Sequence, residues 1–239
     1  MKSLPTTRLR RAALPLGLAA VLALSACGGS GSEDSSSSDV DASEFSINLD
    51  DCEDPAAATE PITGTFDIGY SAPLSGPVAG AVELATAGYD ARIAAANEAN
   101  EVDGIEVVVN YKDDAFAPDQ AKANGVEFIQ NDGVDALATF GTGPLSAMVD
   151  DQNAACVPML YPSSSTAEFS DVEAFPWTTT ILPLASNEAK FLVELIQKRY
   201  PDGASVGVAE NPTASGKVQG EAFQEAADEA GLEIDLVVS

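Results

Sequence analysis

A doubly wound α/β fold, with a parallel sheet and helices on both of its faces, is the fold class that the sequence predicts. The first observation behind this prediction is that, from about residue 65 onward, short β-rich runs alternate strictly with segments of helical spacing. The second is that several of these runs lead into loops rich in Gly, Pro and hydroxyl residues. Strict alternation is typical of right-handed βαβ units, which build parallel sheet.

The predicted strands are short apolar runs bounded by turn-forming residues. In chain order they are TFDIGYSA (65–72), IEVVVNY (105–111), VDALATF (134–140), VPMLY (157–161), WTTTIL (177–182), ASVGVA (204–209) and LEIDLVV (232–238).

Helices are predicted between these strands, because apolar residues recur there every three or four positions. Pro118 suits the first turn of the second helix, and Ser186 precedes the fourth. The first helix is expected to turn one face toward the core, and this face holds Val78, Ala81, Leu84, Ala85, Tyr89 and Ile93. The predicted helices are GPVAGAVELATAGYDARIAAANEA (76–99), APDQAKANGVEFIQ (117–130), PLSAMVDDQNAA (144–155), NEAKFLVELIQKRY (187–200) and KVQGEAFQEAADEA (217–230).

The N-terminus has the features of a secretory signal. Basic residues come first, and the apolar stretch AALPLGLAAVLALSA then reaches Cys27 within LSACGG. This stretch is too short, and too quickly followed by polar residues, to be a stable transmembrane span. The small residues before Cys27 resemble a bacterial lipobox, so residues 1–27 are predicted to be a lipoprotein signal peptide that ends at a lipidated cysteine. The alternative is an ordinary signal peptide in which this cysteine is incidental.

Residues 28–63 are predicted to be a disordered acidic tether. The segment consists largely of Gly, Ser, Asp, Glu, Ala and Pro, with few large apolar residues, and it cannot bury enough surface to order itself. A flexible coil of this length spans roughly 30–35 Å on average, enough to hold a folded body clear of a membrane.

The charge of the chain argues against nucleic acid as a partner. The full chain has a formal charge of −27, and loss of the four basic residues before Cys27 leaves seven basic against 38 acidic residues, a charge of −31. Such a surface repels phosphate backbones and anionic lipid. Membrane contact is therefore expected through the lipid anchor only.

Two further cysteines, Cys52 and Cys156, would lie in an oxidising compartment after export. A disulfide between them is one reading. Two free or separately buried thiols are the other, because nothing local brings the two positions together.

Three loops follow predicted strands and are the places to look for a ligand: APLSGPVAG (72–80), FGTGPLS (140–146) and YPSSST (161–166). Ligands of such sheets bind beyond the carboxyl ends of the strands, where loops lead into helix N-termini. Glycine lets backbone N–H groups approach a ligand and hydroxyls donate hydrogen bonds, so these loops suit a small molecule with a carboxylate. For any single loop, turn chemistry alone explains the composition equally well.

Longer stretches carry a family resemblance. IGYSAPLSGPVAG (68–80), GTGPLSAMVDDQNAACVPMLYPSSST (141–166) and FPWTTTILPLASNEAKFLVELIQKRYPDGASVGV (175–208) resemble the substrate-binding proteins of branched-chain amino-acid ABC transporters, which bind leucine, isoleucine and valine. The resemblance covers nearly everything from residue 66 to residue 239.

This resemblance implies a type I periplasmic-binding-protein fold, in which two α/β lobes close over a ligand. Residues 64–182 would form the first lobe, and residues 183–239 the start of a second lobe that is incomplete. The implied function is an extracytoplasmic, non-enzymatic receptor that captures an amino acid or similar carboxylate and delivers it to an ABC permease in the membrane. The alternatives are a sensor module of the same fold that feeds a signalling partner, and a non-functional fragment.

The resemblance also implies ligand-binding residues. The Thr142 hydroxyl and the neighbouring amides would hold the ligand carboxylate. Ser163, Ser164 and Ser165 would meet the carboxylate or the amino end. Ala81 stands where the family often has an aromatic residue, and Ser215 stands where it often has a tyrosine, so both departures remove an aromatic wall and admit a larger or more polar ligand than leucine.

No catalytic residue, metal site or cofactor is expected. The chain has no histidine, which excludes Ser-His-Asp or Cys-His catalysis and histidine-based metal sites. ENPTASGKV (210–218) only superficially resembles a P-loop, because it lacks the first glycine and the final hydroxyl of that motif. The acid pairs Asp113–Asp114 and Asp150–Asp151 are interpreted as solvated charge.

Overall fold

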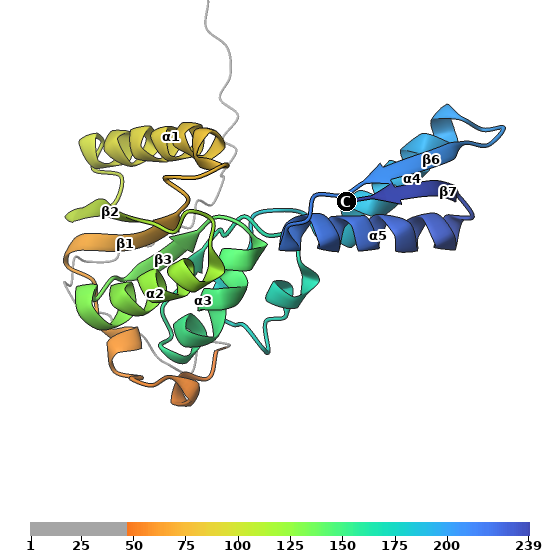
Figure 1. Ribbon diagram of the computed structural model, residues 1–239. Coiled ribbons are helices and arrows are strands. Elements are labelled where there is room, and N and C mark those ends of the chain that lie inside the picture. The colour runs from red at the N-terminus through yellow and green to blue at the C-terminus, as the bar shows by residue number, and fades with distance from the viewer. Residues whose placement is uncertain (1–46) are drawn as a thin grey trace, which may run out of the picture. The chain divides into compact units, whose positions relative to one another are not determined.

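The computed structural model describes residues 47–239, and their strands form two sheets. The predicted signal peptide, Cys27 and the first part of the predicted tether lie outside these residues. The first sheet has the order β2-β1-β3-β4-β5, and every pairing in it is parallel (Figure 1). Its strands are β1 (Gly64–Ala72), β2 (Ile105–Asp113), β3 (Ala136–Thr139), β4 (Met159–Leu160) and β5 (Thr178–Thr179).

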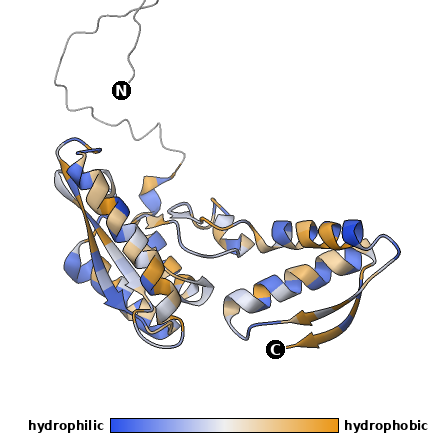
Figure 2. Ribbon diagram, turned by 90° about the horizontal axis from the view of Figure 1, so that it is seen from above, coloured by the Kyte–Doolittle hydropathy of each residue, from blue (hydrophilic) through white to orange (hydrophobic). Residues whose placement is uncertain are grey.

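A second sheet pairs β6 (Ser205–Ala209) with β7 (Glu233–Val238), also in parallel. These two strands are coloured mainly as hydrophobic in Figure 2. Each predicted strand is thus present, although β4 and β5 are shorter than their apolar runs.

The five predicted α-helices are present, each between two strands, and a 3₁₀ turn rather than an α-helix lies between β4 and β5. None of the helices within residues 47–239 combines the length and apolar character that crossing a membrane requires. Short 3₁₀ turns at Leu49–Asp51, Ala57–Thr59 and Ala167–Ser170, and a π-helical turn at Phe128–Asp132, complete the elements. The α-helices are α1 (Ala79–Glu98), α2 (Pro118–Glu127), α3 (Thr142–Ala154), α4 (Ala185–Arg199) and α5 (Ala214–Ala230).

Helices cover both faces of the first sheet, with α1 on one side and α2 and α3 on the other (Figure 1). Successive residues of β1 contact opposite sides. Gly69 meets the buried Phe128 ring of the π-helical turn that continues α2, whereas the Tyr70 ring lies 5.8 Å from that of Tyr89 on α1. The main core fills the α2 and α3 side and consists of Ala121, Phe128, Val134, Leu137, Leu145, Met148, Val149, Met159 and Phe169.

The buried face of α1 differs from the predicted one. Val82 is the only fully buried residue of this helix, and Leu84, which was expected on the core face, is 78 % exposed. Tyr89 and Ile93 of the expected face are half-buried. The helix is rich in alanine on all sides, so the spacing of apolar residues did not distinguish one face from another.

Helices α4 and α5 pack together on the second sheet. Their apolar residues form a separate core, which is smaller than the first and consists of Ala189, Val193, Ala226, Ala227 and Leu232. Gly231, with a φ of 66°, ends α5 in the left-handed conformation that glycine adopts without strain.

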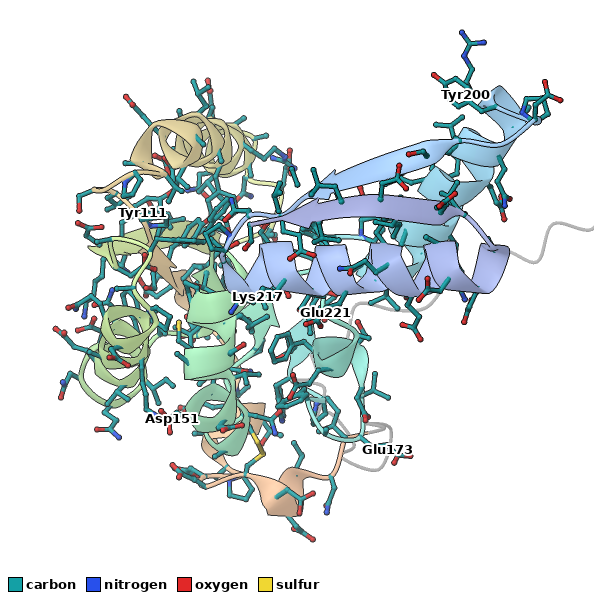
Figure 3. All side chains as sticks on the ribbon, turned by 45° about the vertical axis from the view of Figure 1, so that its right-hand side comes forward. Tyr111, Asp151, Glu173, Tyr200, Lys217 and Glu221 are labelled. Atoms are coloured by element: carbon teal, nitrogen blue, oxygen red, sulfur yellow. A yellow bond between two sulfur atoms is a disulfide. The ribbon has the colours of Figure 1, made fainter. Side chains whose placement is uncertain are left out.

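The segment before β1 is bonded to the first sheet's helices. Cys52 and Cys156 form a disulfide with Cα atoms 5.5 Å apart, visible as a yellow bond in Figure 3, and the Glu53 N–H donates to the Ala154 carbonyl at 2.9 Å. Of the two readings that the sequence left open, the structure has the disulfide. Residues 47–63 therefore differ from the expected featureless tether, because two 3₁₀ turns and a covalent bond order them.

Loss of this disulfide should destabilise the protein. The bond closes a loop of 104 residues, so replacing both cysteines, Cys52→Ser with Cys156→Ser, should lower the free energy of unfolding by roughly 2–4 kcal/mol through a larger unfolded-state entropy. Urea unfolding of oxidised protein and of the double variant, both carrying Cys27→Ser to remove the other thiol, measures the difference. Coincident unfolding midpoints would contradict the prediction.

A tyrosine cluster between β1, β2 and α1 should make stability fall at alkaline pH. Burial raises the pKa of Tyr70 to about 12, and burial with a 2.6 Å hydrogen bond to Asp90 raises the pKa of Tyr111, labelled in Figure 3. Unfolded tyrosine loses its proton near pH 10, so above that pH the folded chain holds more protons and stability falls as pH rises.

The variant Tyr70→Phe has no hydroxyl to ionise. It should therefore lose less stability than wild type between pH 9 and pH 11, by roughly 1–2 kcal/mol in urea unfolding. Tyr200→Phe is the matched control, because Tyr200 is 56 % exposed and lies on another part of the fold. An equal pH slope for Tyr70→Phe and wild type would show that the cluster does not cause the effect.

Candidate ligand-binding site

The three predicted loops follow neighbouring strands at one edge of the first sheet. β1 pairs with β3 and β3 pairs with β4, all in parallel, so the loops that begin after Ala72, Thr139 and Leu160 leave from the same edge. β2 lies on the other side of β1, which places the reversal of strand order between β1 and β3. Ligands of doubly wound sheets bind at such a switch point.

The N-terminus of α3 supplies backbone donors at this edge. Gly141 has a φ of 96° and precedes Thr142, the first residue of the helix. N–H groups in the first turn have no carbonyl partner within a helix, and the macrodipole adds partial positive charge there. Pro144 has no N–H, so the Thr142 and Gly143 amides are the donors that this turn offers.

Hydroxyl groups from two loops meet beside these amides. The Thr142 and Ser164 hydroxyl oxygens lie 3.0 Å apart, within hydrogen-bond distance, and both side chains are buried. The Thr166 N–H donates to the Ser164 hydroxyl at 3.3 Å. The structure thus brings together two of the predicted ligand-binding residues that are far apart in sequence.

Further hydroxyls at this edge are buried without a partner. Thr139 at the end of β3, Ser165 and Thr166 have hydroxyl oxygens that form no hydrogen bond within residues 47–239. Leaving a buried polar group unpaired costs roughly 1–3 kcal/mol, so such groups are rare unless they await a ligand or water. Three of them in adjoining loops make a set of donors with unused capacity.

The other predicted residues lie apart from this contact. Ser163 is half-buried in the same loop as Ser164. Ala81 is exposed in the first turn of α1. Ser215 is half-buried in the first turn of α5, where the Thr213 hydroxyl caps the helix by accepting a 3.2 Å hydrogen bond from the Gly216 N–H.

Aromatic residues at this edge of the first sheet were not among the predicted ligand-binding residues. The half-buried rings of Phe116 and Phe140 have centroids 6.3 Å apart. A Cβ placed on Gly141 would lie 2.7 Å from the Phe116 ring, so that ring packs directly on the backbone that leads into α3. Tyr161, with a φ of 50°, is 63 % exposed after β4. The only signal in the sequence was an aromatic residue at or soon after a strand end.

Asp114 corrects the interpretation of its acid pair as solvated charge. Its side chain is fully buried, and it accepts hydrogen bonds of 2.8 Å from the Ser71 hydroxyl and the Phe116 N–H. Burial raises the pKa of Asp114. Asp113 is exposed, and hydrogen bonds from Ser75 and Ala115 lower its pKa.

The second acid pair is only partly as expected. Asp150 is exposed, whereas Asp151 of α3, labelled in Figure 3, pairs with Lys122 of α2 at 3.1 Å. This ion pair joins two helices on the same face of the sheet.

Comparison with models of protein families identifies the family of this chain. The model of the periplasmic binding protein family matches residues 65–239. A comparison with curated protein sequences found no match.

Solved structures share the fold at low sequence identity. A branched-chain amino-acid ABC transporter structure from Thermus thermophilus with bound valine has a TM-score of 0.66 and 22 % identity, over 73 % of this chain and 45 % of that one. An ABC transporter solute-binding protein from R. palustris in complex with 4-hydroxybenzoate has a TM-score of 0.61 and 24 % identity, over 73 % and 46 %.

A leucine-binding protein from Thermotoga maritima has a TM-score of 0.63 and 15 % identity, over 72 % of this chain and 48 % of that one. The chain thus spans about half the length of these proteins. The match of the family model over most of the chain, on a parallel sheet with its polar loops at one edge, shows that the chain belongs to the periplasmic binding protein family.

Proposed function

We propose that the chain belongs to an extracytoplasmic solute-binding receptor of an ABC importer, and that it binds the carboxylate of an amino acid or similar small solute. The observation that carries this proposal is the contact between Thr142 and Ser164 at the N-terminus of α3, together with the unpartnered hydroxyl of the next residue in that loop, Ser165. Family membership supports the receptor role.

The proposed carboxylate site uses uncharged donors. The amides of Thr142 and Gly143 and the Ser165 hydroxyl would donate to the two carboxylate oxygens. Of the bonded pair Thr142 and Ser164, the hydroxyl that accepts from the other keeps its own proton for the ligand. The helix macrodipole favours negative charge at this end of α3. Valine and 4-hydroxybenzoate, which the Thermus thermophilus and R. palustris structures hold, both carry a carboxylate.

The remaining contacts would come from outside this group of donors. Ser163 would meet the carboxylate or the amino end from the same loop as Ser164 and Ser165. Ala81 would border the variable part of the ligand, and Ser215 would contribute from the first turn of α5. A receptor of this family closes because its ligand binds the closed state better than the open one, so contacts from both lobes determine the affinity.

The N-terminal sequence supports a proposal for where the protein is located and which partner it has. Lipidation of Cys27 would fix the chain to the outer face of the membrane, and an ABC permease there would receive the solute. The disulfide attaches the segment before β1 just beyond the C-terminal end of α3, whereas Thr142 begins that helix. Thirteen residues of helix are about 20 Å long, so the tether would join the lobe at the end away from the ligand donors.

Carboxylate binding can be measured on this chain by NMR. Titration with benzoate and with L-leucine should shift the amide signals of Thr142, Gly143 and residues 164–166, and benzamide and L-leucinamide should bind at least tenfold more weakly. The reason is that an amide lacks the charge that the donors and the helix dipole favour. NMR titration detects dissociation constants in the millimolar range, which a site with contacts from one lobe requires.

Two substitutions and a control locate the site. Thr142→Val and Ser165→Ala should each weaken carboxylate binding by roughly tenfold, the effect of losing one charge-assisted hydrogen bond. Ser170→Ala, at an exposed serine in a neighbouring 3₁₀ turn, should leave binding unchanged. Equal binding of benzoate and benzamide, or shifts confined to other residues, would refute the proposed site.

A further inference from the structure

We propose that Phe116 is a specificity-determining residue of this site, that buried Asp114 is the positioning residue that holds it, and that the ligand is therefore a carboxylate with an aromatic ring. The inference rests on the proposed function and deepens it. An aromatic residue at position 81 would otherwise form one wall of the ligand site. In this chain Phe116, in the loop after β2, would form that wall instead.

The backbone of this loop adopts an uncommon conformation. Ala115 and Phe116 have φ angles of 49° and 63°, and residues other than glycine, particularly bulky ones, rarely adopt positive φ. Such conformations persist only when surrounding contacts hold them. The contacts that hold Phe116 come from its N–H on one side and its ring on the other.

Asp114 holds the N–H side. One carboxylate oxygen accepts the Phe116 N–H at 2.8 Å, and the other accepts the Ser71 hydroxyl of β1 at 2.8 Å. Asn124 of α2 donates to the Ser71 oxygen at 3.1 Å and to the Asp113 carbonyl at 3.1 Å. Because β1, β2 and α2 all contribute to this buried network, the position of the loop is fixed by the core of the fold.

The Phe116 ring packs against Gly141. With no Cβ on Gly141, the Phe116 ring lies directly against the residue that precedes Thr142. Phe140 lies beside it, at a centroid distance of 6.3 Å. Both rings are half-buried, so each retains surface that a ligand can cover.

The rings and the carboxylate donors are therefore neighbours through Gly141 and Thr142. A ligand whose carboxylate meets the α3 N-terminus would extend its body past these rings, and an aromatic body gains from offset or edge-to-face contact with them. Asp114 does not compete as a ligand contact, since both of its oxygens already accept hydrogen bonds within the core.

Three carboxylates test the wall while keeping the anchoring group constant: benzoate, cyclohexanecarboxylate and acetate. By NMR titration, Phe116→Leu should weaken benzoate binding at least fivefold and change acetate binding less than twofold. Cyclohexanecarboxylate should bind wild type more weakly than benzoate does, and Phe116→Leu should narrow that gap. Phe175→Leu is the matched control, because Phe175 is also half-buried in an aromatic pair, with Phe169 on another side of the core.

The positioning role of Asp114 has a separate test. Asp114→Ala should reproduce the selective loss of benzoate over acetate, whereas Asp114→Asn, which keeps an oxygen to accept the Phe116 N–H, should restore most of it. A merely structural role would weaken both probes equally in both variants. Amide exchange at Phe116 provides a readout that does not need the alanine variant to fold: it should be slow in wild type and at least tenfold faster in Asp114→Asn, whose neutral acceptor is weaker.

The outcomes separate this inference from the proposed function. If no probe shifts the amides of Thr142 and residues 164–166, the proposed function fails and the inference fails with it. If the probes shift those amides but Phe116→Leu affects benzoate and acetate alike, only the inference is overturned. Fast exchange of the Phe116 amide in wild type would overturn the role of Asp114.

Discussion

The contact of the Phe128 ring with the backbone of Gly69 is the constraint on which the first lobe depends. Gly69 lies in the middle of β1, and a Cβ there would lie 2.6 Å from the ring. The ring is fully buried and joins the core that includes Leu137 of β3 and Leu145 of α3. The absence of one methyl group thus lets the end of α2 lie close to the sheet, and α3 packs beside it. The Lys112 ammonium lies 4.4 Å from the centroid of the same ring and covers it from the β2 side.

Apolar runs predicted the strands, including β7, whose residues are mostly exposed, and helical spacing predicted the helices between them. The repeat is clearest in α4 and α5, which bury one face. The repeat failed on α1, where alanine occupies several faces and Val82 alone carries the fully buried contact. The loops that hold Thr142 and the serines at 163–165 could be located because chain order and parallel pairing bring strand ends to one edge, whereas the choice of these residues within the loops came from the family resemblance. Phe116 and Asp114 could not be predicted, since their roles depend on Gly141 and Ser71, which lie 25 and 43 residues away in the sequence. The sequence could not decide the disulfide for the same reason, because its cysteines are 104 residues apart and only the fold brings them together.

Helix α3 connects the two functional ends of this lobe. Its first residue, Thr142, supplies a hydroxyl and an amide to the proposed carboxylate site, and Cys156, just beyond its last turn, anchors the segment that leads to the N-terminus. Gln152 near the end of the helix donates to the carbonyls of Val157 and Trp177, which ties the helix to the strands β4 and β5. Rotation of α3 would therefore disturb the disulfide to the segment before β1, the strands β4 and β5, and the proposed donors together. This coupling favours a lobe that moves as a rigid body when a receptor of this family closes.

The negative charge of the chain bears on the uncharged donors of the proposed carboxylate site. The chain has a formal charge of −27, and an anionic solute approaches it against that field. Lysine in the site could offset the field, but the two lysines within residues 64–182 are already paired: Lys112 with Glu127 and Asp132, and Lys122 with Asp151. The long-range repulsion is screened over about 8 Å in physiological salt, whereas the amides and hydroxyls act at contact distance. Neutral donors at a helix terminus can therefore hold a carboxylate at contact distance without a fixed cation.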